Sequence, residues 1–232
     1  MDANRRIAIV VGVLYIIGTL AGVLSVVFTS PSLSAPDYLG RIPANENQII
    51  LGGLCVLVMG FALALVPVLL YPIFKKQNEI LALGYVVFRG GLETVTDMLV
   101  AVAFLLLPIA GRGFAQAGAA QASGYAAMGD VLQGVTHLPV TGFAFSLGAL
   151  MIYTLLYRSK LVPRWISVWG FIAIALQLAT LVLITFGLQN DSSIENSLMN
   201  APIFFQEMVM AVWLIARGFN PTALKTLAAN PA

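Results

Sequence analysis

The chain has 232 residues, of which 59% are hydrophobic and only 9% are charged, with a formal net charge of +2. Soluble domains carry about 25% charged residues, so this composition excludes an ordinary soluble globular domain. No basic block suggests a nucleic-acid partner, and the single cysteine, Cys55, excludes an intrachain disulfide. We therefore expect an all-α, polytopic transmembrane helix bundle whose main partners are membrane lipids.

Six apolar runs follow one another along the chain, and a helix needs about 20 such residues to cross the hydrocarbon core. The runs are Ile7–Phe28, Ile49–Phe74, Ile80–Ile109, Thr136–Tyr157, Leu161–Leu188 and Ala201–Ala216. The first run is longer than the roughly 7–15 apolar residues of a cleavable signal, so we interpret it as a retained span. The prediction is a single transmembrane domain over residues 1–232 with six spans.

Two connections between the predicted spans are longer than a turn requires. The first, Thr29–Gln48, contains three prolines, and we expect it to be mostly irregular. The second, residues 111–135, is rich in alanine, glycine and glutamine, and its part Ala115–Leu132 could form a helix on the membrane surface. We expect either an ordered connector or a lid over the bundle there.

Basic residues gather on alternate connections. If the chain crosses six times, nine of the twelve lysines and arginines fall on one side: Arg5, Arg6, Lys75, Lys76, Arg158, Lys160, Arg164, Arg217 and Lys225. Only Arg41 and Arg112 fall on the other side, and Arg89 lies within a span. Because loops rich in lysine and arginine stay in the cytoplasm, we predict that both termini are cytoplasmic.

The third apolar run carries Arg89, Glu93 and Asp97 at a spacing of four residues, which places them near one face of a helix. Charged groups at membrane depth are costly and almost always face the interior of the bundle. At about 1.5 Å per residue, counting in from Lys76 places Glu93 near mid-membrane. The three residues therefore define the inner face of this helix.

Other polar residues within the runs are candidates for the same site. The sixth run carries Gln206 and Glu207, and Glu207 also falls near mid-membrane. The fifth run carries Gln177, and the fourth begins with His137, the only histidine. We expect these side chains to converge with the charges of the third run on one polar pocket.

The charges of this cluster do not balance. Arg89 supplies one positive charge, whereas Glu93, Asp97 and Glu207 could supply three negative ones. Such an excess is prohibitive in a low dielectric. A carboxyl could be protonated, a cation or cationic ligand could bind, or Asp97 could face water. The remaining alternative is a neutralised structural strut between helices.

Several chemistries lack their residues. No lysine lies within a span, so a retinal Schiff base is excluded, and one histidine cannot supply a bis-histidine haem or a histidine-rich zinc site. The sequence carries no phosphate-binding loop and no dinucleotide fingerprint. We expect no cofactor and no metal, and no catalytic residue can be named.

Three stretches together resemble a known family: Tyr71–Glu79 running on to Arg89 and Glu93, Leu156–Trp165 leading to Gly170, and Ala201–Pro202 leading to Glu207 and Gly218. The chain is similar over nearly its whole length to the bacterial membrane family called domain of unknown function 4386. The resemblance implies a bacterial cytoplasmic (inner) membrane location but no reaction. It also implies that Arg89, Glu93 and Glu207 fall on recurrent motif positions.

We therefore expect a protein that binds or transports a proton, a cation or a small amphiphile at the cluster. Glu93 and Glu207 would carry the proton or ligand, and Arg89 would hold them. An enzyme that uses a carboxylate as general acid or base on a lipid-soluble substrate is the less favoured alternative. A structural or signalling partner, in which the charges pin helices together, is the third. The oligomeric state is not indicated.

Overall fold

The computed structural model describes residues 2–190 and 193–229, and within them every regular element is helical. Six helical segments are long and apolar enough to cross a membrane. They are Ala3–Leu33, Glu46–Phe74, Glu79–Gln116, Ala120–Ser159, Arg164–Thr185 and Ile194–Ala216. The all-helical class with six spans is thereby confirmed, and the chain is a multi-pass membrane protein.

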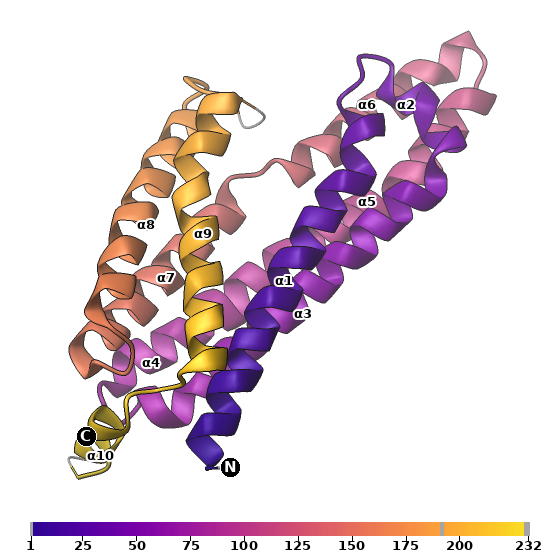
Figure 1. Ribbon diagram of the computed structural model, residues 1–232. Coiled ribbons are helices and arrows are strands. Elements are labelled where there is room, and N and C mark those ends of the chain that lie inside the picture. Colours follow the sequence, from indigo (N-terminus) through magenta and orange to yellow (C-terminus); the bar gives the residue numbers. More distant parts are fainter. Residues whose placement is uncertain (1, 191–192, 230–232) are drawn as a thin grey trace. The chain divides into compact units, whose positions relative to one another are not determined.

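The helices follow one another with short connections (Figure 1). In chain order they are α1 (Ala3–Leu33), α2 (Tyr38–Arg41), the 3-10 helix η1 (Ile42–Ala44), α3 (Glu46–Phe74), α4 (Glu79–Tyr85), the π-helix η2 (Val86–Leu92), α5 (Glu93–Gln116), α6 (Ala119–Thr136), α7 (Val140–Ser159), α8 (Arg164–Thr185), α9 (Ile194–Ala216) and α10 (Pro221–Ala229). The elements α4, η2 and α5 together form one continuous helical run, and it corresponds to the third predicted span.

The prediction that Thr29–Gln48 is mostly irregular is wrong. Helix α1 continues through Pro31 to Leu33, and α2 and η1 fill much of the remaining connection. Leu39 and Ile42 are buried, so apolar packing outweighs the proline content of the segment. Pro43 stands in the first turn of η1, where the N–H that proline lacks would have no partner in any case.

The chain forms two compact units, which are described separately. Unit 1 comprises Met1–Ile17, Phe61–Thr94 and Pro139–Ala232, and unit 2 comprises Gly18–Gly60 and Val95–Leu138. Each unit therefore combines segments that lie far apart in the sequence.

Unit 2 is built around an apolar core. Its buried members come from the end of α1, from α2, η1, α3 and α5: Leu33, Leu39, Ile42, Ile49, Val56, Ala101, Phe104, Leu107 and Ala110. Glycine allows close helix contacts here, because a Cβ atom at Gly52 would lie 2.2 Å from the Cγ2 of Thr29. Small residues at such contacts are typical of membrane helices, whose association relies on close packing.

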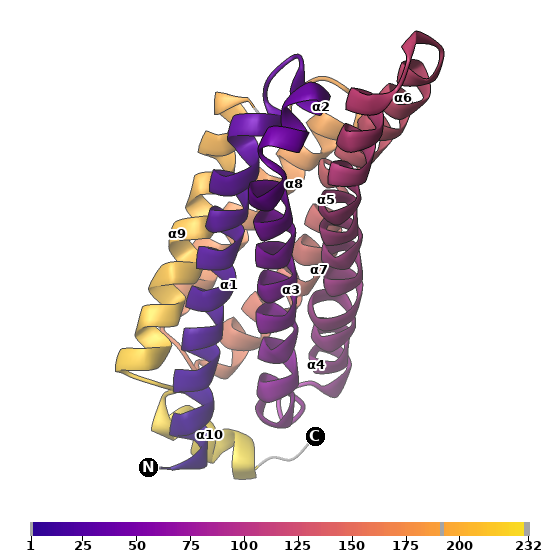
Figure 2. The same ribbon diagram turned by 90° about the vertical axis from the view of Figure 1, so that its right-hand side faces the viewer.

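Unit 1 is held together by α7, which packs against α4, η2 and α8, while α8 packs in turn against α9. Figures 1 and 2 show that the start of α1 and the helix α10 lie at the same end of this unit. There Arg5 donates hydrogen bonds to the carbonyl oxygens of Leu214 and Ile215 at 2.9 and 2.5 Å. A basic group at these carbonyls offsets the negative end of the α9 helix dipole.

The ends of the helices in unit 1 are fixed by local side chains and by backbone conformation. Asn78 caps α4 by accepting a hydrogen bond from the backbone N–H of Leu81 at 2.9 Å. Helix α9 ends at Ala216, and two residues later Gly218 has a φ of +71°, a conformation that is strained for other residues. The Gly218 N–H bonds back to the carbonyl oxygens of Trp213 and Leu214. This tight stop turns the chain towards α10.

Candidate functional site

The π-helix η2 sets the position of Arg89. It contains the sequence VVFRGGL, whose two adjacent glycines weaken the preference for a regular α-helix. Pro67 of α3 lies against one of them, because a Cβ atom at Gly90 would lie 3.2 Å from the Cγ of Pro67. Short π segments inside helices are frequent at functional sites. The irregularity was not predicted, and the Gly90-Gly91 pair is the feature of the sequence that could have indicated it.

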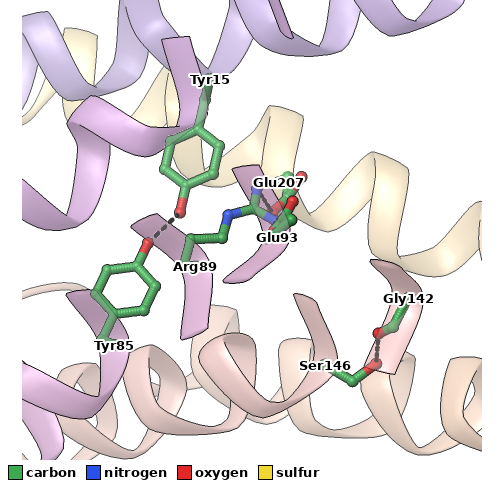
Figure 3. A network of polar contacts seen from close by, with 7 residues as sticks. All are labelled: Tyr15, Tyr85, Arg89, Glu93, Gly142, Ser146 and Glu207. Carbon is green, nitrogen blue, oxygen red and sulfur yellow. Dashed lines mark hydrogen bonds and ion pairs between the residues drawn. The ribbon is translucent and has the colours of Figure 1, made fainter. Parts of the chain in front are cut away.

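Arg89 is almost completely buried and binds two carboxylates (Figure 3). Its Nη1 donates to both carboxylate oxygens of Glu93, at 2.8 and 3.0 Å. Its Nη2 donates to Glu207 Oε1 at 3.2 Å, which links η2 to α9. The structure thus brings together three of the predicted site residues, and Arg89 is their centre.

The two carboxylates are held unequally. Glu93 receives two hydrogen bonds from Arg89, and its side chain is 6% exposed. Glu207 receives one longer bond, and its side chain is 14% exposed. Glu207 is therefore the more weakly held and more accessible carboxylate of the pair.

Helix α7 completes the surroundings of the guanidinium. The Cζ of Arg89 lies 4.5 Å from the centre of the Phe145 ring, within the range of a cation–π contact. One turn of α7 away from that ring, a Cβ atom at Gly148 would lie 3.1 Å from the backbone nitrogen of Arg89. Glycine at this position therefore lets α7 approach η2 closely enough to bring Phe145 onto the guanidinium. Neither residue was predicted.

Two tyrosines lie beside Arg89 (Figure 3). The hydroxyl groups of Tyr15 and Tyr85 are 3.1 Å apart and hydrogen-bonded, and both residues are buried. Figure 3 shows the pair beside the Arg89 side chain. Helix α1 reaches this position because Gly12 packs against α9, where a Cβ atom would lie 2.6 Å from the carbonyl oxygen of Ala211. Tyrosines within an apolar span were the overlooked signal, since a buried hydroxyl needs a partner.

Gln206 has a separate role from its neighbour Glu207. It is fully buried, accepts a hydrogen bond from the Tyr153 hydroxyl at 2.6 Å, and donates to the carbonyl oxygen of Ile166 at 3.0 Å. These two bonds join α7, α8 and α9. The side-chain oxygen and nitrogen of Gln206 are thus both engaged in holding the helices that carry the charge cluster.

Three predicted site residues remain: Gln177, Asp97 and His137. Gln177 is on α8, and among the described hydrogen bonds none links its side chain to the charge cluster. Asp97 and His137 belong to unit 2. Asp97 is buried beside Gly60, where an added Cβ atom would lie 3.2 Å from the Asp97 Cβ. His137 is exposed in the break between α6 and α7, so it ends a helix instead of starting a span.

The charge cluster, as we name Arg89, Glu93 and Glu207, has one guanidinium for two carboxyl groups. When both carboxyls are ionised, one negative charge remains without a matching positive charge in the cluster. Asp97, one helical turn beyond Glu93 on α5, is a further buried carboxyl, and it belongs to unit 2. Among the described residues, no group of three or more His, Cys, Asp or Glu side chains is arranged to hold a metal ion. The geometry suits an exchangeable proton or a single positive charge.

Comparison with known proteins identifies a family but no activity. No curated protein and no solved structure matches the chain. The family described as Domain of unknown function (DUF4386) matches residues 10–218, which is most of the chain and includes the whole charge cluster. The chain therefore belongs to this family of unknown function.

Proposed function

We propose that the protein binds or transports a proton, a small cation or a cationic amphiphile at the charge cluster, and that Glu207 is the exchanging group. The observation that supports this most is the sharing of one buried guanidinium between two carboxylates. An unmatched buried charge is costly, so a bound proton or cation stabilises the cluster.

The unequal hydrogen bonding of the two carboxylates supports a different role for each. Glu93 lies one helical turn from Arg89 and takes two of its hydrogen bonds, so it serves as the fixed counterion. Glu207 comes from another helix, takes one longer bond, and is the more exposed of the two. When Glu207 gains a proton or a cation, Arg89 remains neutralised by Glu93.

The test is flux in proteoliposomes that contain the full chain. For the proton, a pH gradient is imposed and an internal pH-sensitive dye reports proton movement. For the small cation, sodium in the buffer is replaced by potassium. For the cationic amphiphile, the uptake of tetraphenylphosphonium is measured. We expect a flux above that of protein-free liposomes, which E207Q abolishes. E195Q is the matched control, because Glu195 lies on the same helix in its first turn. Flux of E207Q equal to that of the unsubstituted protein contradicts the proposal.

A structural role is the second candidate, and a specific arrangement favours it. Arg89 and Gln206 together connect the helical run Glu79–Gln116 and α7, α8 and α9 through buried hydrogen bonds. In this case the triple substitution R89M, E93Q and E207Q, which leaves no carboxylate of the cluster without its counterion, keeps the fold, and the unsubstituted protein shows no flux above that of protein-free liposomes. A triple variant that folds but loses a flux present in the unsubstituted protein favours the first proposal.

We also propose that both termini lie in the cytoplasm of a bacterial cell, with the bundle in its inner membrane. The support is the placement of nine basic residues on one set of connections. The test replaces Cys55 by alanine and adds one cysteine, either next to Asp2 or in residues 111–135. A membrane-impermeant maleimide applied to spheroplasts is expected to label the second site and not the first. The reverse pattern contradicts the orientation.

A further inference from the structure

At the end of unit 1 where α7 and α9 stop and α8 and α10 begin, the structure contains a pocket of about 570 Å³. It is lined by the connections Lys160–Arg164 and Arg217–Pro221 together with Trp213. We call it the basic pocket, because Lys160, Arg164 and Arg217 all line it. Its volume falls within the range of about 300–1,000 Å³ that is typical of small-molecule sites.

We propose that the basic pocket binds a phosphate-bearing anion, either the headgroup of an anionic lipid or a free phosphate compound.

Within residues 2–190 and 193–229, no acidic side chain forms an ion pair with the basic residues of the pocket. None of the ion pairs among the described residues involves Lys160, Arg164 or Arg217. In unit 2 the opposite holds, because Arg41 is paired with Asp37 at 2.8 Å and Arg112 is paired with Glu46. Three basic side chains without acidic partners around one hollow create an attractive field for an anion.

The walls of the pocket are held in place. The backbone N–H of Asn220 donates to the carbonyl oxygen of Leu161 at 2.9 Å, which joins the two connections that line it. Arg164 is held over the Tyr157 ring, 4.7 Å from its centre, and its Nε donates to the Tyr157 carbonyl oxygen. The pocket is thus formed before any ligand binds, which reduces the entropy lost on binding.

Helix ends around the pocket also favour an anion. Arg5 already offsets the negative end of α9 through its bonds to Leu214 and Ile215. Helices α8 and α10 start at Arg164 and Pro221, which both line the pocket, so their positive ends lie there. A second hollow of about 270 Å³, lined by Arg158 and again by Lys160, extends the basic lining.

The position of the pocket suits a molecule at the membrane surface. Its lining residues lie at or beyond the ends of three candidate spans, which stop at Ser159 and Ala216 and start at Arg164. Trp213, Leu161 and Phe219 add an apolar wall. Basic hollows between membrane helices at this level bind anionic lipid headgroups, and tryptophan is common at the interface.

The experiment uses the full chain with W165F and W169F, so that Trp213 is the one remaining tryptophan. Brominated phosphatidylglycerol and brominated phosphatidylcholine are compared as quenchers of its fluorescence in vesicles that otherwise contain phosphatidylcholine. In the protein with its basic residues intact, we expect the anionic lipid to quench the Trp213 fluorescence at a mole fraction about thirtyfold lower than in the variant R164Q/R217Q. A basic residue close to the bound headgroup strengthens such binding about fivefold, so the loss of two from the pocket corresponds to about thirtyfold.

The matched control is K75Q/K76Q, which removes two basic residues from a connection that does not line the basic pocket. We expect this control to change the quenching less than threefold, because screened charges outside the pocket act weakly. An equal loss in both variants overturns the proposal. Equal quenching by both lipids of the protein with its basic residues intact also overturns it, and this comparison requires no folded variant.

A third arm separates the two sources of the anion. Glycerol phosphate and inorganic phosphate are added to the same vesicles at millimolar concentration. If they leave quenching by brominated phosphatidylglycerol unchanged, the ligand is the lipid headgroup. If they displace the lipid in the protein and not in R164Q/R217Q, the pocket takes a free phosphate compound, and the proposed anion chemistry still stands.

Discussion

In unit 1, buried charged and hydroxyl groups join the helices in addition to apolar packing, whereas in unit 2 apolar side chains packed against glycine are the main contacts between helices. Unit 1 buries Arg89 and Glu93 beside the hydrogen-bonded hydroxyls of Tyr15 and Tyr85. Unit 2 buries a leucine-, isoleucine- and alanine-rich core, and its two ion pairs lie on exposed or half-exposed side chains. Asp97 is its buried charged residue among those described.

The comparison indicates that buried charge is not needed to hold these helices together. Close packing against small residues associates membrane helices without placing ions in a low dielectric. Removing two charges from water costs more than their attraction often returns. A buried charge cluster is therefore weak evidence for a purely stabilising role, and this argument supports the function proposed for it.

The largest effect is expected from R89M. This substitution leaves Glu93 and Glu207 buried without their shared counterion, and breaking a buried ion pair costs about 3–5 kcal/mol. Unfolding in mixed detergent at neutral pH measures the loss. Adding E93Q and E207Q to R89M is expected to recover most of it. A triple variant as unstable as R89M would show that the guanidinium acts through packing and not through charge.

A smaller effect is expected in unit 2 from G52A. The new methyl group would collide with the Cγ2 of Thr29, a stiff β-branched side chain, and overpacking of this kind costs about 1–3 kcal/mol. G134A is the matched control, because an added Cβ atom at Gly134 has no neighbour within 4 Å. Equal unfolding free energies for the two variants would refute the close-packing account of unit 2.

Removal of one hydroxyl in unit 1 is expected to cost about 1 kcal/mol. Y153F leaves the side-chain oxygen of Gln206 buried without the 2.6 Å hydrogen bond that it now accepts. The free energy of unfolding should fall, while binding at the charge cluster should change little. The control is Y157F, since the Tyr157 side chain is exposed. A larger cost for Y157F than for Y153F would contradict the account of Gln206.

The smallest effect is expected on the pH dependence of stability, and it comes from a contact in unit 2. Partial burial, and then the hydrogen bond to Asp130, raise the pKa of the Tyr38 hydroxyl. A raised pKa in the folded protein means that this contact stabilises it below the ordinary phenol pKa of about 10, and that the stabilisation is lost as pH rises through the higher folded value. Y38F should show a shallower loss of stability in alkaline buffer. An unchanged slope would show that the contact contributes nothing.

Much of the fold was predictable, because the length of the apolar runs and the spacing of basic residues between them can be read from local composition. Six spans and the all-helical class follow from hydropathy alone. The structure of Thr29–Gln48 did not follow, since its prolines indicate a loop while its buried apolar residues pack into a core. That outcome depends on contacts between distant segments, which no local pattern encodes.

The charge cluster was predictable in part for the same reason. Charges within apolar runs identified Arg89, Glu93 and Glu207, and the structure brings these three together. The aromatic ring of Phe145 and the tyrosine pair reach the cluster through helix contacts at Gly148 and Gly12. Both glycines lie far from Arg89 in the sequence. The sequence also groups Asp97 with the cluster, one helical turn beyond Glu93, and that grouping stays a prediction.

The central claim is that Glu207 exchanges a proton or positive charge while Glu93 stays bound to Arg89. Infrared difference spectra of the full chain in lipid, recorded between acidic and alkaline buffer, test it most directly through the C=O stretch of protonated carboxyls. We predict a band that E207Q removes and that the Glu195 control, E195Q, leaves in place. A spectrum that E207Q leaves unchanged would contradict the account.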